Sequence, residues 1–196
     1  MRRRKIKIAA TNIRFPEETM NGSLTSKQVL LNEYAAEMLR KNIDKLGSKN
    51  GLQRLQARSA MIALGESAID IFAELVMHPN WIVRREAVKA LSQMKTNITA
   101  PVLIYALEDE YASIRWVAAE GLIALGKQGL LVLMQRLCSQ KLSVNLSQVA
   151  HHVVKEISKR QSMIETEELL ANLENPSRYY LVPVNARNVL NLLSSN

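Results

Sequence analysis

Few side chains in this sequence are spaced in a way that would support catalysis. The histidines are His78, His151 and His152, and the single cysteine is Cys138. Adjacent residues on a helix point about 100° apart, so His151 and His152 are not expected to share a metal ion. The sequence has no HExxH motif, no GxSxG motif and no phosphate-binding glycine loop. We therefore expect a protein without enzymatic activity, bound metal or cofactor, in which Cys138 is a small core residue.

A second group of residues is typical of binding. Trp116 and Glu120 stand one helical turn apart, and Arg85 and Lys89 have the same spacing about 30 residues earlier, one turn after Trp81. An exposed tryptophan among charges often anchors a protein partner, and cations suit an acidic peptide or a phosphate. We predict that these five residues form part of a partner site. The alternative is that Trp116 packs between neighbouring helices and that the charges are only solvated.

Positive charge is concentrated at the front of the chain. Residues 1–58 hold 13 Lys and Arg against 5 Asp and Glu, whereas residues 161–196 hold 2 against 4. The strongest cluster consists of Arg2, Arg3, Arg4, Lys5 and Lys7. Such an asymmetry predicts an anionic or acidic partner at this end, which is an acidic protein surface, the phosphates of a nucleic acid or an anionic membrane surface. The alternative is a tail that only keeps the protein in solution.

Composition favours helices and a reducing compartment. Hydrophobic residues make up 47% of the chain, aromatic residues only 5%, and Gly and Pro number 7 and 5. The apolar stretches are too short for a transmembrane helix, which needs about 20 residues, and the basic start lacks the apolar core of a signal peptide. A single cysteine excludes an internal disulfide. We expect a cytoplasmic protein.

The elements that would position these side chains are repeated along the chain. Three segments are similar to one another: RLQARSAMIALG from Arg54, VRREAVKALSQM from Val83 and IRWVAAEGLIALG from Ile114. Aligning them places Arg54, Arg84 and Arg115 together, at spacings of 30 and 31 residues. A degenerate fourth copy, VNLSQVAHHVVKEI, follows from Val144. Small residues in the three copies allow a neighbouring helix to approach closely. They are Ala57, Ala87 and Ala118, then Ala60, Ala90 and Gly121, followed by the larger Leu64, Met94 and Leu125.

Partner helices are expected between these segments, from Ser67, Thr99 and Lys127. Thr99 is predicted to cap the second of them, with Pro101 in its first turn, and Gly65 and Gly126 are predicted to end the helices that precede them. The repeating unit is then a helical hairpin. We expect a basic extended or disordered segment over residues 1–25, a repeat array with an N-terminal capping helix over residues 26–160, and a helical cap over residues 161–196.

The run LEDEYASIRWVAAEGLIALG, residues 107–126, resembles the short HEAT-like repeat first associated with phycobilin lyases. The resemblance covers about residues 52–160 and implies an all-α, right-handed solenoid of about four repeats with helical caps. It also implies a structural ladder in which a turn acid pairs with the arginine that opens the second helix. Asp109 and Arg115 match both positions, whereas Arg54 and Arg84 match only the arginine, and His78 stands where the acid would be for Arg84.

The resemblance leaves two functions open. The first is a non-catalytic adaptor or scaffold that holds a protein partner in its concave surface and on its basic N-terminal segment. The second is a nucleic-acid-binding protein, including one similar to HEAT-like DNA glycosylases for alkylated bases, which use an aromatic residue and an acid one turn apart. Trp116 and Glu120 have that spacing, but the equivalent steps of the other copies are basic only at Arg85 and Lys89. We therefore favour the adaptor.

Overall fold

The computed structural model of this chain describes residues 26–139, 142–161 and 166–194, and all regular elements in these residues are helical. The chain divides into two compact units, residues 1–40 and 41–196, and the helices from α2 onward belong to the second unit. The α-helices are α1 (Ser26–Leu46), α2 (Gly51–Ile62), α3 (Ser67–Leu75), α4 (Trp81–Met94), α5 (Ala100–Ala106), α6 (Ala112–Ala124), α7 (Lys127–Ser139), α8 (Val144–Gln161), α9 (Glu167–Glu174) and α10 (Val182–Ser194). Short 3₁₀ helices, η1 (Asn97–Thr99) and η3 (Pro176–Leu181), precede α5 and α10.

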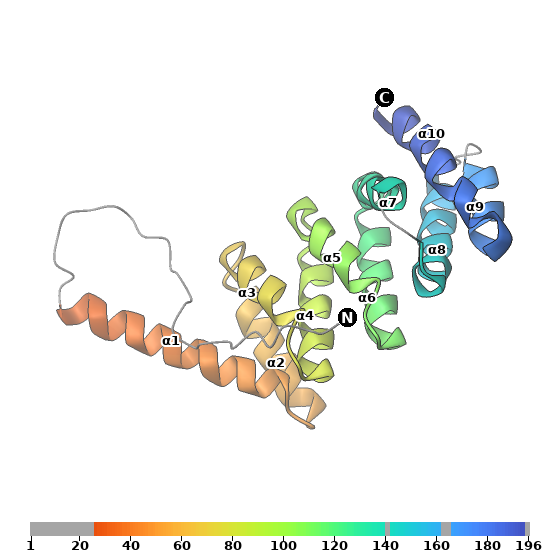
Figure 1. Ribbon diagram of the computed structural model, residues 1–196. Coiled ribbons are helices and arrows are strands. Elements are labelled where there is room, and N and C mark those ends of the chain that lie inside the picture. The colour runs from red at the N-terminus through yellow and green to blue at the C-terminus, as the bar shows by residue number, and fades with distance from the viewer. Residues whose placement is uncertain (1–25, 140–141, 162–165, 195–196) are drawn as a thin grey trace. The chain divides into compact units, whose positions relative to one another are not determined.

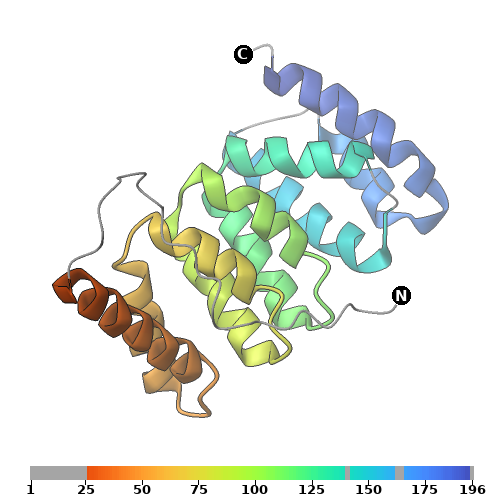
Figure 2. The same ribbon diagram turned by 60° about the vertical axis from the view of Figure 1, so that its left-hand side comes forward.

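Helices α2 to α8 are arranged in two rows, as Figures 1 and 2 show. Helices α2, α4, α6 and α8 contact one another in succession, and we call them the even row. Helices α3, α5 and α7 each pack on the following helix of the even row, which gives helical hairpins. The expected all-α solenoid of hairpin repeats is confirmed.

Helices α9 and α10 lengthen the two rows at the C-terminal end. Here the helix that joins the even row, α9, comes first in the chain. Helix α9 packs on α8 and so continues the even row, whereas α10 packs on α7. The two helices also contact each other, and both bury apolar side chains such as Leu169, Val182 and Val189. They therefore cover apolar surface that α7 and α8 present at this end of the array.

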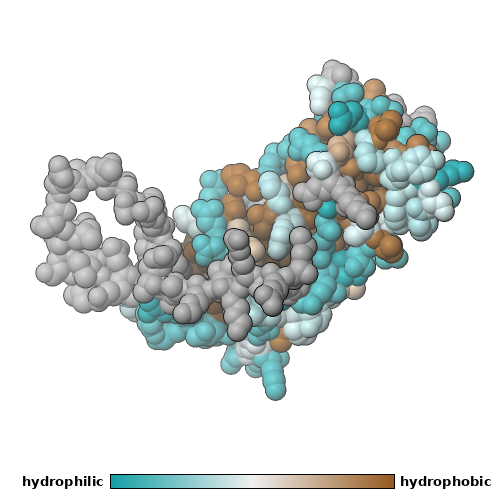
Figure 3. All heavy atoms as spheres, viewed as in Figure 1, coloured by the Kyte–Doolittle hydropathy of each residue, from teal (hydrophilic) through white to brown (hydrophobic). Residues whose placement is uncertain are grey.

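The core lies between the two rows. Phe72, Leu103 and Leu133 of α3, α5 and α7 are fully buried, as are Leu91 and Leu122 of α4 and α6. The small residues predicted to admit neighbouring helices are buried at Ala57, Ala87 and Ala118, and also at Ala90 and Gly121. The first copy differs, because Ala60 and Leu64 are exposed. Over the face visible in Figure 3, hydrophobic and hydrophilic residues are interspersed.

Of the residues predicted to begin or end helices, Gly65, Gly126 and Pro101 do so and Thr99 does not. Gly65 and Gly126 have left-handed φ angles of 68° and 57°, as predicted for glycines that end helices. Pro101 lies in the first turn of α5 as expected, but Thr99 does not cap that helix. Its Oγ1 instead donates to the Thr96 carbonyl oxygen at 2.8 Å, because η1 places Thr99 in a helical turn of its own. Among the described helices, none is long and apolar enough to cross a membrane.

Candidate functional site

The three aligned arginines hold the turns that precede their own helices. Each donates from Nη1 to the two carbonyl oxygens that lie six and five residues earlier: Arg54 to Ser48 (2.7 Å) and Lys49 (3.0 Å), Arg84 to His78 (3.0 Å) and Pro79 (3.3 Å), and Arg115 to Asp109 (2.8 Å) and Glu110 (3.1 Å). Carbonyl groups in these turns have no partner in a helix, so a charged donor satisfies them well. The alignment by arginine therefore identifies equivalent structural positions.

The carboxylate of Asp109 pairs with the arginine of the preceding repeat. Arg84 donates from Nε to Oδ2 at 2.7 Å and from Nη2 to Oδ1 at 3.2 Å. Arg115, which the resemblance pairs with this carboxylate, instead donates to the turn carbonyls. The hydrogen bond to Asp109 raises the pKa of the Arg84 guanidinium above its ordinary value, against the opposing effect of burial. Glu110 adds a second, half-exposed carboxylate at 3.0 Å. The arginine–aspartate pair of the ladder therefore connects one repeat to the next, and does not join two residues of the same repeat.

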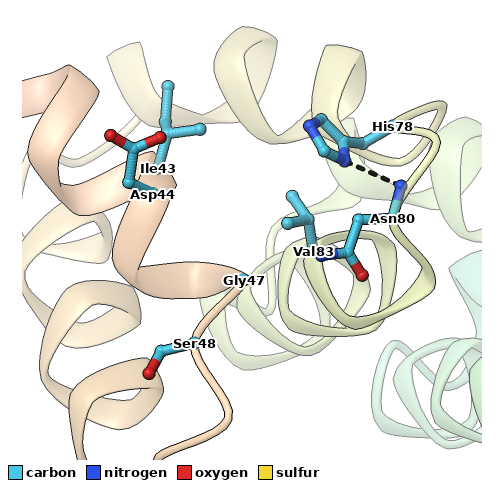
Figure 4. A pocket seen from close by; sticks show the side chains of 7 residues that line it. All are labelled: Ile43, Asp44, Gly47, Ser48, His78, Asn80 and Val83. Atoms are coloured by element: carbon cyan, nitrogen blue, oxygen red, sulfur yellow. Dashed lines mark hydrogen bonds between the residues drawn. The ribbon is translucent and has the colours of Figure 1, made fainter.

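His78 replaces Asp109 in the preceding turn and acts as a neutral acceptor. Its Nδ1 accepts from the Asn80 backbone N–H at 3.0 Å, just as Asp109 Oδ1 accepts from the Tyr111 N–H at 2.9 Å. Burial lowers the pKa of His78, and the nearby Arg84 lowers it further. Figure 4 shows His78 and Asn80 at a pocket of about 230 Å³ beside Ser48. Because these polar groups serve the turns, we regard the pocket as structural.

A buried carboxylate joins α2 to α4. Glu86 is almost fully buried and forms an ion pair through Oε2 with Arg58 Nη1. Its Oε1 lies 3.4 Å from both Arg54 Nε and Lys89 Nζ. Arg58 also donates from Nε to Gln93 Oε1 at 3.1 Å. One carboxylate therefore faces three cations, which leaves an excess of positive charge at this point of the even row.

Trp116 is a surface residue with a fixed orientation. Trp116 is 53% exposed, so it packs only in part against the neighbouring helix. Its ring stacks on His152 of α8, with centroids 4.4 Å apart and planes 21° apart. His152 Nε2 lies 2.9 Å from Glu120 Oε1. The tryptophan, the acid and the histidine thus form one cluster across α6 and α8.

The excess positive charge and the tryptophan meet in one groove across α2, α4 and α6. It has a volume of about 460 Å³ and is lined by the cations Arg58, Lys89 and Lys95, by Trp116 and Glu120, and by Ser92, Gln93, Val117 and Gly121. Gly121 allows α4 and α6 to lie close here, because a Cβ atom would come within 2.9 Å of Leu103 Cδ1 and nearer still to Ser92 Oγ. We call this depression the groove.

The five predicted binding residues are only partly brought together. Lys89, Trp116 and Glu120 line the groove, whereas Trp81 and the half-buried Arg85 do not. Trp81 stacks on Tyr111, with centroids 5.0 Å apart. The basic residues Arg2, Arg3, Arg4, Lys5 and Lys7 lie outside the described residues.

Sequence reasoning missed Arg58, Lys95 and His152 as members of the site. The available signal was the repeat length, because His152 stands 32 residues after Glu120 and Arg58 stands 28 residues before Glu86. Residues one repeat apart on the same helix face are neighbours in a stack. Searching for a carboxylate and a basic or imidazole side chain at about that separation would have found both pairs.

Comparison with known families identifies the repeats. Residues 39–123 match the family model described as HEAT repeats, which covers the end of α1 through most of α6. This stretch of the chain, which is less than half of its length, is similar to HEAT repeats. The match stops before α7 and α8, although these two helices contact each other and continue the two rows. No curated protein matches the sequence. HEAT repeats generally mediate protein–protein interaction.

Proposed function

We propose that this HEAT-repeat chain is a non-catalytic adaptor or scaffold that binds a protein partner along the even row of helices. The basic N-terminal segment would serve as a second contact. The observation that carries the proposal is Trp116, which is half-exposed, fixed by His152 and set beside a positively charged groove. We also expect the protein to act in the cytoplasm, since its single cysteine needs no oxidising compartment.

The exposed part of Trp116 is large enough to anchor a partner. A tryptophan buries roughly 150–250 Å² when fully covered, so the exposed half of Trp116 offers about 100 Å². At about 25 cal/mol per Å² this corresponds to roughly 2.5 kcal/mol. Since stacking on His152 already restricts the ring, little side-chain entropy remains to be lost on binding. Tryptophan in such a setting is typical of an interface hot spot.

The neighbouring groups favour binding over catalysis. Glu120 is the only carboxylate lining the groove among the described residues, and it is already bonded to His152. Among the described residues, no group of three or more His, Cys, Asp or Glu side chains is placed to hold a metal ion.

A nucleic-acid function is the second candidate, because Arg58, Lys89 and Lys95 lie in the same groove as Trp116 and Glu120. This arrangement resembles the cation, aromatic and acid set expected of a HEAT-like DNA glycosylase. It is less favoured because the cations lie on one side of the groove. The positions of α8 that align with Trp116 and Glu120 are Leu146 and Ala150, and both are buried and apolar. A phosphate backbone requires cations along its path.

A pull-down from native lysate distinguishes the two candidates. The immobilised full chain should retain one stoichiometric protein whether or not the lysate is treated with nuclease. Trp116→Ala should reduce this capture strongly. Tyr105→Ala is the matched control, because Tyr105 is also an exposed aromatic residue but lies on α5, outside the groove. Capture that disappears with nuclease, or that depends equally on Tyr105, would contradict the proposal.

A further inference from the structure

The groove has an unbalanced charge. Glu86 is the only carboxylate that contacts Arg54, Arg58 and Lys89 in the described ion pairs, and it can neutralise one of the three. Lys95 adds an exposed cation at the end of α4, where it lines the groove. The single carboxylate of the lining, Glu120, points its Oε1 to His152. The carboxylates near the groove therefore do not neutralise all of its cations.

Trp116 lies in the same groove as these cations. His152 covers one face of the indole and is not part of the groove lining. Trp116 lines the groove together with Lys89 and Lys95. An apolar stacking surface therefore lies beside two accessible ammonium groups, one partly exposed and one exposed.

We propose that the groove binds an acidic peptide segment of the partner that carries an aromatic side chain. The aromatic side chain packs against Trp116, and carboxylates on either side of it pair with Lys89 and Lys95. The inference rests on the proposed protein-binding function and specifies the chemistry of the segment that is bound. Charge complementarity with the two lysines selects acidic residues in the peptide. The exposed indole selects an aromatic side chain, because aromatic rings stack on one another.

Both the size and the charge distribution of the groove favour a short peptide over a nucleic acid. A volume of about 460 Å³ holds a few side chains. The cations come from α2 and α4 alone, and Glu120 stands on the α6 side, where it would repel a phosphate chain that crossed the row. A peptide can place its carboxylates on the α4 side only, whereas a nucleic acid carries a phosphate at every step.

The test is selection of peptides from a phage-displayed library of random dodecapeptides on the purified full chain. The selected peptides should be enriched in Asp and Glu around an aromatic residue. One of them is then synthesised and titrated in a Trp81→Phe background, where Trp116 is the only tryptophan and its fluorescence reports binding. We expect Trp116→Ala, followed by calorimetry, to weaken binding about 30-fold and Lys95→Glu about 10-fold. Affinity should also fall as salt is raised.

Lys127→Glu is the matched control, because Lys127 is an exposed lysine at the start of α7 and lies outside the groove lining. It should leave the affinity unchanged. Selected peptides without acidic residues, or equal losses from Lys95→Glu and Lys127→Glu, would overturn the inference. A 20-nucleotide oligothymidylate that binds more tightly than any selected peptide, with loss on Lys95→Glu, would also overturn it in favour of a nucleic acid. A natural partner whose affinity depends on Trp116 but not on Lys95 would refute the inference and leave the proposed function standing.

Discussion

Removing the Arg84 side chain should destabilise the array far more than removing the equivalent Arg115. Both arginines donate to two turn carbonyls, and each such hydrogen bond contributes about 0.5–1.5 kcal/mol. Arg84 additionally holds Asp109 in a bidentate pair, in which the two side chains are 5% and 10% exposed. Its substitution therefore leaves a carboxylate without its partner in a nearly buried site.

Breaking a buried ion pair by removing one partner costs about 3–5 kcal/mol. Because Asp109 lies near the surface and keeps its bond to the Tyr111 N–H, we expect the lower part of that range. Glu110 is half-exposed, so its pairing with Arg84 adds little. With the two carbonyl bonds at the low end of their range, the expected destabilisation is about 1 kcal/mol for Arg115→Ala, and the broken ion pair raises it to about 4 kcal/mol for Arg84→Ala. At roughly 2–4 °C per kcal/mol for a domain of this size, Arg84→Ala should lower Tm by about 10 °C.

Urea denaturation of the two variants, followed by circular dichroism, measures the difference. A double-mutant cycle with Asp109→Asn isolates the charge pair, because the amide oxygen of asparagine can still accept from the Tyr111 N–H. We expect a coupling energy of about 2 kcal/mol between Arg84 and Asp109 and none between Arg115 and Asp109. Equal destabilisation by the two alanine substitutions, or a coupling energy near zero for Arg84, would show that the ladder does not stabilise the stack.

Three further predictions concern other parts of the chain. Gly129→Ala should prevent stable folding, as measured by thermal melting, because a Cβ atom there would overlap the Leu122 carbonyl group and backbone cannot move aside as a side chain can. Stability should fall as the pH is lowered through the ordinary histidine pKa of about 6.5, because burial lowers the pKa of His78 and the unfolded chain then binds the proton more readily. His78→Asn should weaken that pH dependence, and a part should remain because burial also lowers the pKa of His151. Deleting residues 1–10 should remove weak, salt-sensitive binding to duplex DNA measured by anisotropy, and tight sequence-specific binding lost in the same deletion would instead favour the nucleic-acid function.

The repeated helices could be predicted from sequence because each signal is local. Arg54, Arg84 and Arg115 recur at nearly constant spacing, and apolar residues follow the helical period between them. Glycines at Gly65 and Gly126 mark helix ends through a conformation that other residues rarely adopt. Thr99 misled because the same hydroxyl can bond within a preceding 3₁₀ turn as readily as it can cap a helix.

The pairings between repeats could not be predicted in the same way. Sequence resemblance placed Asp109 with Arg115 in one repeat, whereas the guanidinium of Arg84 reaches the same carboxylate across the stack. Which arginine binds depends on how closely two helices approach, which a single sequence does not specify. Trp116 was selected correctly as exposed, but its partner His152 lies one helix further along the even row.

Calorimetry with the purified partner tests the central claim, which is that the even row binds a protein through Trp116. The partner should bind the wild-type chain and the Tyr105→Ala control with equal affinity. Trp116→Ala should weaken binding about 30-fold, which corresponds to roughly 2 kcal/mol, while its Tm stays within a few degrees of the wild type. Unchanged affinity in Trp116→Ala, with the variant still folded, would contradict the account.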